Sequence, residues 1–177
     1  MLYENPDLYD TLLPASAGQR NFYVTLAQRR GGAVLALACG SGQIIVPIAA
    51  TGLAATGLDS STEMLEAANR RAAASGARVE WIQGDMREFD LGKRFSLIFV
   101  ARNSLLHLSE PEDFAGFFSS VRRHLVLDGV LAFDIFNPDL RLLCRPGGQR
   151  FGVMETTSSS HGKITVESTN DYDRLSQ

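Results

Sequence analysis

The chain has 177 residues, 45% of them hydrophobic and 21% charged, which predicts one soluble globular domain with a sizeable core. The formal net charge of −3 supplies no basic field for a phosphate backbone, so a small molecule is a better partner than nucleic acid. No apolar run approaches the roughly 20 residues of a membrane span. No apolar segment follows a basic start, so we expect a cytoplasmic protein without membrane contact.

The N-terminal part is predicted to be an arm followed by a helix. Residues 1–16 are rich in Tyr and Pro without a clean period, which predicts an irregular arm without a helix of its own. Residues 17–30 place apolar side chains at helical spacing, and Gly31 and Gly32 end that helix.

A glycine-rich turn follows the first predicted strand. The apolar run of residues 33–37 suits a strand covered on both faces, and residues 43–51 suit a crossover helix. Between them, Gly40 and Gly42 allow the backbone to turn sharply and to approach a ligand closely. Ile45 stands where a dinucleotide-binding turn would have a third glycine, so this turn does not predict NAD.

Two acidic residues follow the next two predicted strands. Asp59 is the last residue of the predicted strand 54–59. It follows the glycine-rich turn by about 20 residues, which is the spacing of a ribose-binding carboxylate. Asp85 follows residues 79–83 and is placed to accept a hydrogen bond from an exocyclic amine, so the two carboxylates would bracket an adenosine. Between them, Ser60 and Glu63 match a capping box for a helix that ends near residue 75. Met64 on that helix is either a core residue or a ligand contact.

The fourth predicted strand, residues 95–100, leads to the expected reaction site, because open α/β sheets bind ligands at the carboxyl ends of their strands. There Asn103 is expected to orient a substrate or cofactor. His107 is either a general base or a structural residue on a short helix that hydrogen-bonds to the backbone. A helix over residues 110–124 and a fifth strand over 130–136 come next, and residues 150–156 and 163–170 predict a hairpin. Cys39, Cys144 and the histidines, including His161, lack metal-ligand spacing, so no metal site is predicted.

The segments VLALACGSG, GLDSSTEML, VEWIQGDM and FSLIFVARNSLLHL, in that order, resemble class I S-adenosylmethionine-dependent methyltransferases, especially their small-molecule branch. The resemblance spans roughly residues 9–140. It implies an α/β fold: a Rossmann-like three-layer sandwich whose mostly parallel sheet has strand order 3-2-1-4-5, with helices on both faces, and here a C-terminal β-hairpin. The domain would occupy residues 17–140, and residues 141–177 would form the appended hairpin.

The resemblance implies S-adenosylmethionine as cofactor. In the family, the glycine-rich turn faces the methionine portion, the acid after strand two holds the ribose, and the acid after strand three meets the adenine amine. An N-terminal arm also closes over the cofactor, although Tyr9 could instead pack on the domain surface. The cofactor-binding residues predicted here are Ala38, Gly40, Ser41, Gly42, Asp59, Ser60, Met64, Asp85 and Met86.

The predicted function is methyl transfer to a small-molecule acceptor by in-line displacement, catalysed mainly by alignment, with Asn103 and His107 as the catalytic candidates. Ala36 stands where the family usually has Asp or Glu, and few residues follow the fifth strand. These departures leave open a cofactor-binding or interaction domain without turnover. They also predict either a truncated form or a homodimer that pairs through the edge of the fifth strand.

Overall fold

A computed structural model describes residues 2–137, 139, 141, 148, 150–158 and 162–169. The chain divides into two compact units, Met1–Ile135 and Phe136–Gln177. Cys144 and His161, for which we predicted no functional role, lie outside the described residues. Within the described part of the chain, no helix is long and apolar enough to cross a membrane.

The first unit contains a five-stranded parallel sheet in the order β3-β2-β1-β4-β5, which confirms the predicted order. Its strands are β1 (Val34–Leu37), β2 (Ala55–Asp59), β3 (Glu80–Gln83), β4 (Phe95–Val100) and β5 (Leu125–Phe133). Leu37 pairs with Leu58 on one side and with Val100 on the other, so the three central strands end at one level. The strand order reverses between β1 and β4, which is where such sheets open a ligand cleft.

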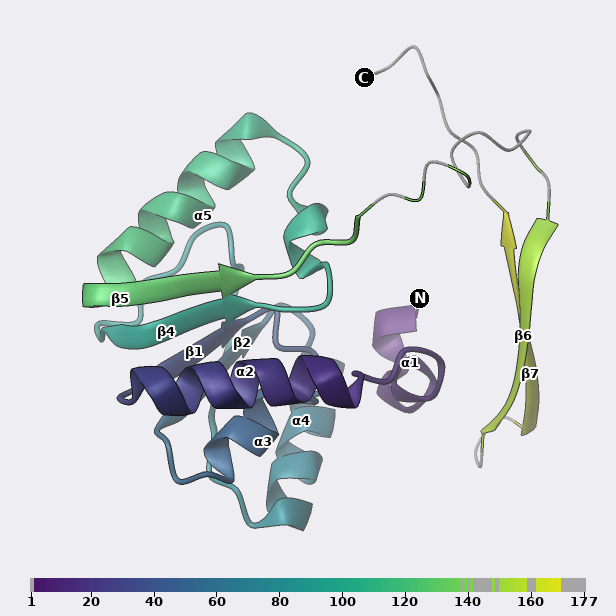
Figure 1. The fold of residues 1–177 in the computed structure, drawn as a ribbon, viewed down its shortest axis with the longest axis horizontal. Helices are drawn as coiled ribbons and strands as arrows, with labels where there is room; N and C mark the ends of the chain where they lie inside the picture. Colours follow the sequence, from purple (N-terminus) through teal and green to yellow (C-terminus); the bar gives the residue numbers. More distant parts are fainter. Residues whose placement is uncertain are drawn as a thin grey trace. The chain divides into compact units, whose positions relative to one another are not determined.

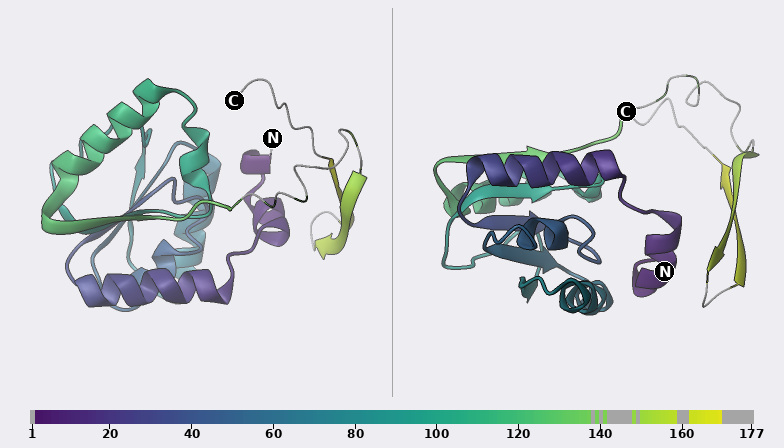
Figure 2. Two further views of the ribbon diagram at one scale, coloured as in Figure 1. Left: turned by 45° about the horizontal axis from the view of Figure 1, so that its top comes forward. Right: turned by 60° about the horizontal axis from the view of Figure 1, so that its bottom comes forward.

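Helices cover both faces of this sheet, as predicted. They are α2 (Ala17–Arg30), α3 (Ile45–Ala49), α4 (Thr62–Ser75) and α5 (Pro111–His124). Along β1 the side chains alternate: Ala36 packs with Tyr23 of α2 on one face, whereas Leu35 packs with Phe117 of α5 on the other. Figure 2 shows α2 and α5 on opposite sides of the sheet, which makes the three-layer sandwich.

Two local predictions in this unit are wrong. The fifth strand was expected over residues 130–136, but it begins at Leu125, directly after α5, ends at Phe133 and pairs with β4 through a register shift. Asp128 takes a φ of 64° within that irregular stretch. The N-cap of α4 is Ser61, whose side chain accepts a hydrogen bond from the backbone N–H of Met64 at 3.2 Å, so Ser60 is not the capping residue.

The prediction of an irregular arm is also wrong, because the N-terminus forms the short 3-10 helix η1 (Leu2–Glu4) and the helix α1 (Pro6–Leu12). The Asn5 side chain caps α1 by accepting a hydrogen bond from the N–H of Leu8 at 3.1 Å. Pro6 then occupies a first-turn position that needs no N–H donor. Figure 1 shows α1 beyond the arrowheads of β4 and β5, at the carboxyl ends of the strands.

The described part of the second unit confirms the predicted hairpin. Strands β6 (Arg150–Ser158) and β7 (Gly162–Thr169) pair antiparallel. Two ion pairs cross between the strands, from Arg150 to Glu167 and from Lys163 to Glu155, each at 3.0 Å. These pairs support the strand register on an exposed ribbon.

Candidate ligand-binding site

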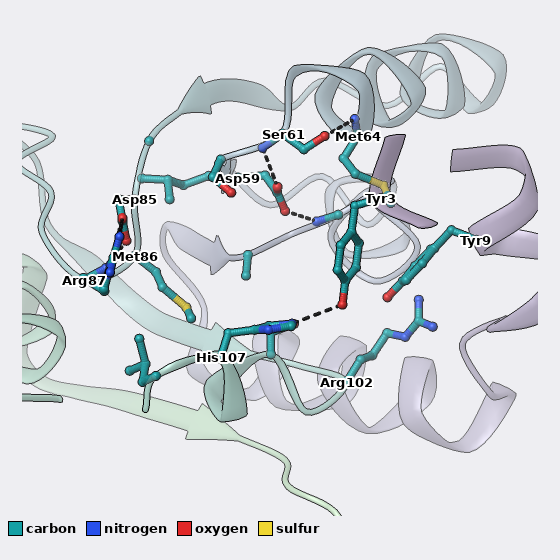
Figure 3. A pocket seen from close by; sticks show the side chains of 17 residues that line it. Tyr3, Tyr9, Asp59, Ser61, Met64, Asp85, Met86, Arg87, Arg102 and His107 are labelled. Carbon is teal, nitrogen blue, oxygen red and sulfur yellow. Dashed lines mark hydrogen bonds and ion pairs between the residues drawn. The ribbon is translucent and has the colours of Figure 1, made fainter. Parts of the chain in front are cut away.

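A cavity of about 380 Å³ lies at the carboxyl ends of the strands, between the N-terminal helices and the loops that follow β1 to β4. Figure 3 shows side chains from these separate segments pointing toward the same space. The structure brings together eight residues that the sequence singled out as site residues: Ala38, Gly40, Asp59, Ser60, Met64, Asp85, Met86 and His107.

The other three predicted site residues lie elsewhere. Ser41 lines a smaller adjoining cavity, which shares Ala38, Gly40 and Arg102 with the main one. Gly42 packs behind the turn, where an added Cβ would lie 3.1 Å from side-chain carbons of Val46 and Ala68. Asn103 is exposed and lines neither of these two cavities, so its role remains a prediction.

The turn after β1 leaves open space beside its backbone. Gly40 has a φ of 54°, and no atom outside its immediate neighbours lies within 4 Å of the position that a Cβ would take. A ligand can therefore approach the backbone here. Ala38 adopts a φ of 48°, a left-handed conformation that costs a non-glycine residue about 1–2 kcal/mol.

Asp59 is the most buried charged residue of the cavity, with 9% of its surface exposed. Its Oδ2 accepts a hydrogen bond from the N–H of Gly40 at 2.6 Å, and its Oδ1 accepts one from the N–H of Ser61 at 3.0 Å. Burial raises the pKa of Asp59, and these backbone donors oppose that rise by stabilising the ionised form. A carboxylate has about four acceptor positions, so Asp59 can also accept hydrogen bonds from ligand hydroxyls.

Asp85 lines the cavity in an ion pair with Arg87 that the sequence did not reveal. Its Oδ2 accepts hydrogen bonds from Nε and Nη2 of Arg87 at 2.9 and 2.6 Å. This arginine lowers the pKa of the Asp85 carboxyl, which therefore stays ionised. Arg87 also reaches Asp113 of α5 at 3.4 Å, so the guanidinium lies between two carboxylates.

The N-terminal helices contribute two tyrosines that we did not predict as site residues. The hydroxyl of Tyr3 lies 3.1 Å from Nε2 of His107, on the 3-10 helix η2 (Ser104–His107). The ring of Tyr9 stacks under Arg102, whose guanidinium carbon lies 4.9 Å from the ring centroid. Burial raises the pKa of Tyr9, and Arg102 opposes that rise. Both tyrosines line the cavity, so the N-terminal segment forms part of its wall (Figure 3).

Asp10 fastens α1 to the glycine-rich turn. Its carboxylate accepts hydrogen bonds from the Ser41 hydroxyl and the Gln43 amide, and it pairs with Arg71 of α4, each at 2.5 Å. Arg71 is only partly exposed, with 34% of its side chain accessible to solvent. Residues far apart in the sequence thus hold the wall in place.

Comparisons with known proteins define the class of this chain. The methyltransferase domain family matches residues 34–129, more than half of the chain, so the chain belongs to that family. The match includes the glycine-rich turn, both acidic residues and the segment after β4. It confirms the resemblance that the sequence motifs indicated.

Individual relatives agree with this assignment. YqeM of Bacillus subtilis (strain 168) is named as an inferred methyltransferase. It is 33% identical over 138 residues, which cover 76% of this chain and 56% of the YqeM chain. A dTDP-3-amino-3,6-dideoxy-alpha-D-glucopyranose N,N-dimethyltransferase of Streptomyces fradiae is 30% identical over 105 residues, covering 59% of this chain and 40% of its own. This chain thus spans about half the length of the curated relatives it matches.

Solved structures agree with the fold. The glycopeptide N-methyltransferase MtfA, in complex with S-adenosyl-L-methionine, superposes with a TM-score of 0.61 at 26% identity, covering 86% of this chain and 66% of that one. An S-adenosylmethionine-dependent methyltransferase from Clostridium acetobutylicum ATCC 824 superposes with a TM-score of 0.70 at 19% identity, covering 92% and 77%.

Proposed function

We propose that this chain transfers a methyl group from S-adenosylmethionine to a small-molecule acceptor. The observation that carries the proposal is the pair of carboxylates, Asp59 and Asp85, that line one cavity beside the open backbone of Gly40. The family match, and MtfA with S-adenosyl-L-methionine bound, support the same cofactor.

The residues of the cavity fit the parts of this cofactor. Asp59 would accept hydrogen bonds from the ribose hydroxyls, because its two oxygens retain acceptor capacity after bonding Gly40 and Ser61. Asp85 would accept one from the adenine amine, and the buried side chain of Met64 would contact the apolar ring. The cofactor is a sulfonium that supplies an activated methyl carbon, so no protein nucleophile is needed. The protein's main contribution is alignment, which is worth roughly 7–11 kcal/mol.

His107 is the proposed base for acceptors that must lose a proton. It lies at the cavity wall next to the expected acceptor position, and its Nε2 faces the Tyr3 hydroxyl at 3.1 Å. The structural alternative put His107 on a short helix, and the residue does lie on η2, so its role as a base stays a prediction. An acceptor that displaced the Tyr3 hydroxyl would meet the imidazole directly. Asn103 would contribute to the turn that precedes His107.

Amines are the acceptor class that we propose first. The Streptomyces fradiae relative is an N,N-dimethyltransferase of an amino sugar, and MtfA is an N-methyltransferase of a glycopeptide. An amine loses one proton during methylation, which suits a histidine at the cavity wall. The net charge of −3 supports a small acceptor over nucleic acid, and the free Cys39 is compatible with a cytoplasmic location.

A label-transfer assay tests the proposal. The full chain would be incubated with methyl-labelled S-adenosylmethionine and separate pools of amino sugars, other small amines, acids and phenols. We expect label in the amine pools, and we expect its loss in Asp59→Ala, while Glu66→Ala, which removes an exposed carboxylate of α4, keeps it. Tight cofactor binding without transfer to any pool would support the alternative of a binding domain without turnover.

We also propose that two copies pair through β5. This strand ends the five-stranded sheet, and Leu127 is 92% exposed on it. Such an edge offers unpaired backbone groups to a second chain. Sedimentation at several concentrations, with hydrogen exchange on residues 125–133, tests this. A monomer at all concentrations would refute the homodimer.

A further inference from the structure

The turn after β4 has an unusual backbone. Arg102 and Asn103 both have a φ of 63°, so two consecutive non-glycine residues adopt the left-handed conformation. That conformation is unfavourable for residues with a Cβ and persists only where the surroundings hold it. Such turns are concentrated at functional sites, and this one lies at the carboxyl end of a central strand.

Asp134, directly after β5, holds this turn. Its Oδ1 accepts hydrogen bonds from the backbone N–H groups of both Arg102 and Asn103, the latter at 3.3 Å. Its Oδ2 accepts a hydrogen bond from Nε2 of Gln19 on α2. One carboxylate therefore connects α2, the end of β5 and the turn after β4. Two successive N–H groups that point at one anion form a concave binding surface, and here that surface is filled by the protein itself.

The turn presents the Arg102 side chain to the ligand space. Arg102 lines both the main cavity and the smaller one beside Ala38 and Ser41. Among the described residues that line the smaller cavity, it is the only one with a charged side chain. Its Nη2 donates to the carbonyl of Leu13, and its plane rests on Tyr9, so further N–H groups of the guanidinium can face a ligand.

The position of Arg102 indicates its ligand. Asp59 and Asp85 define the adenosine end of the main cavity, so an amino-acid portion would lie at its other end, beside Gly40 and Arg102, where a smaller cavity of about 30 Å³ adjoins it. Ala36 lines that smaller cavity and carries no charge. An amino-acid carboxylate needs a cation there, and a guanidinium binds a carboxylate through two parallel hydrogen bonds.

We propose that Arg102 binds the carboxylate of the cofactor's methionine portion and that Asp134 is the positioning residue that orients it. This inference rests on the proposed function, because it assumes that an adenosyl amino acid occupies the cavity. The strained turn after β4 would then recognise that amino acid, and Arg102 would be a cation of the site that the sequence did not predict.

Calorimetry with two ligands tests the inference. S-Adenosylhomocysteine carries the amino-acid carboxylate, whereas 5′-methylthioadenosine has the same adenosine and thioether without it. We expect Arg102→Met to weaken S-adenosylhomocysteine about 10-fold or more and to change 5′-methylthioadenosine less than about twofold. Arg102→Lys, which keeps the charge without the fork, should give an intermediate loss. Arg70→Met, at an exposed arginine of α4, is the matched control and should change neither ligand.

The Asp134→Asn variant tests the positioning role. We expect it to weaken S-adenosylhomocysteine about threefold or more, to leave 5′-methylthioadenosine unchanged, and to add nothing in combination with Arg102→Met. Equal losses for both ligands, an unchanged affinity for S-adenosylhomocysteine, or additive losses in the double variant would overturn the inference while the proposed function stood. If the unaltered chain bound neither ligand, the proposed function would fail and the inference with it.

Discussion

Replacing Asp59 with alanine should remove the strongest anchor of the cofactor. The carboxylate is charged and almost fully buried, and it would accept two ribose hydroxyls in addition to the N–H groups of Gly40 and Ser61. A hydrogen bond to a charged group contributes about 1.5–3 kcal/mol, so losing two costs about 3–6 kcal/mol. This corresponds to a decrease in affinity of roughly 10²- to 10⁴-fold.

The same substitution also affects the ligand-free protein. It leaves the N–H groups of Gly40 and Ser61 without their acceptor, which costs about 1–3 kcal/mol for each group that water cannot reach. Binding and stability must therefore be measured separately, by calorimetry with S-adenosylhomocysteine and by chemical denaturation. Glu66→Ala, at an exposed carboxylate of α4, is the matched control for both measurements.

A ligand variant isolates the ribose contact. Removing the 2′-hydroxyl from S-adenosylhomocysteine should weaken binding to the unaltered chain, and the same change should have little effect on Asp59→Ala. If a folded Asp59→Ala variant bound S-adenosylhomocysteine with unchanged affinity, the assignment of this carboxylate to the ribose would be refuted.

Three further outcomes are expected. Because burial raises the pKa of Asp59, affinity for S-adenosylhomocysteine should be full above that raised pKa and should fall as the pH drops through it; titrations of Asp59→Asn should lack this transition. Asp10→Ala should speed hydrogen exchange in residues 6–12 by about tenfold or more without changing β1, because α1 loses its charged contacts to the glycine-rich turn. Ala36→Asp should destabilise the ligand-free protein by about 3–5 kcal/mol, because the new charge would be buried beside Phe99. The same substitution should tighten cofactor binding by about 1 kcal/mol or more, measured by calorimetry. No gain in affinity would mean that the cofactor's amine is held elsewhere.

The strands and the acids could be predicted because each depends on a local pattern, whereas the strand order followed from the family resemblance. Strands such as 34–37 and 95–100 are short apolar runs that are buried on both faces. Parallel strands end at one edge, so Asp59 and Asp85, each at or just beyond a strand end, had to meet there. Neither inference required knowledge of a distant contact.

The N-terminal wall of the cavity and the cation Arg102 could not be predicted in this way. Asp10 and Arg71 meet across 61 positions, and Arg102 and Asp134 across 32, through contacts that leave no periodic trace in the sequence. The helix α1 did have a local signal in Asn5 and Pro6, a cap followed by a first-turn proline. The prediction gave more weight to proline as a breaker, although that residue fits the first turn of a helix.

The backbone of the site is strained in a way that the sequence motifs do not show. Three of the four described non-glycine residues with positive φ, namely Ala38, Arg102 and Asn103, lie in the turns after β1 and β4; the fourth, Asp128, lies in β5. At about 1–2 kcal/mol each, Ala38 and Arg102 cost about 2–4 kcal/mol, whereas asparagine tolerates this conformation more easily; that cost is a sizeable part of the 5–15 kcal/mol that stabilises a typical domain. Strain of that size persists only if the surrounding contacts oppose it, as the Asp134 carboxylate does for two of the three residues. The turns are therefore held in shape before any ligand binds, which is the condition under which alignment alone can accelerate a displacement.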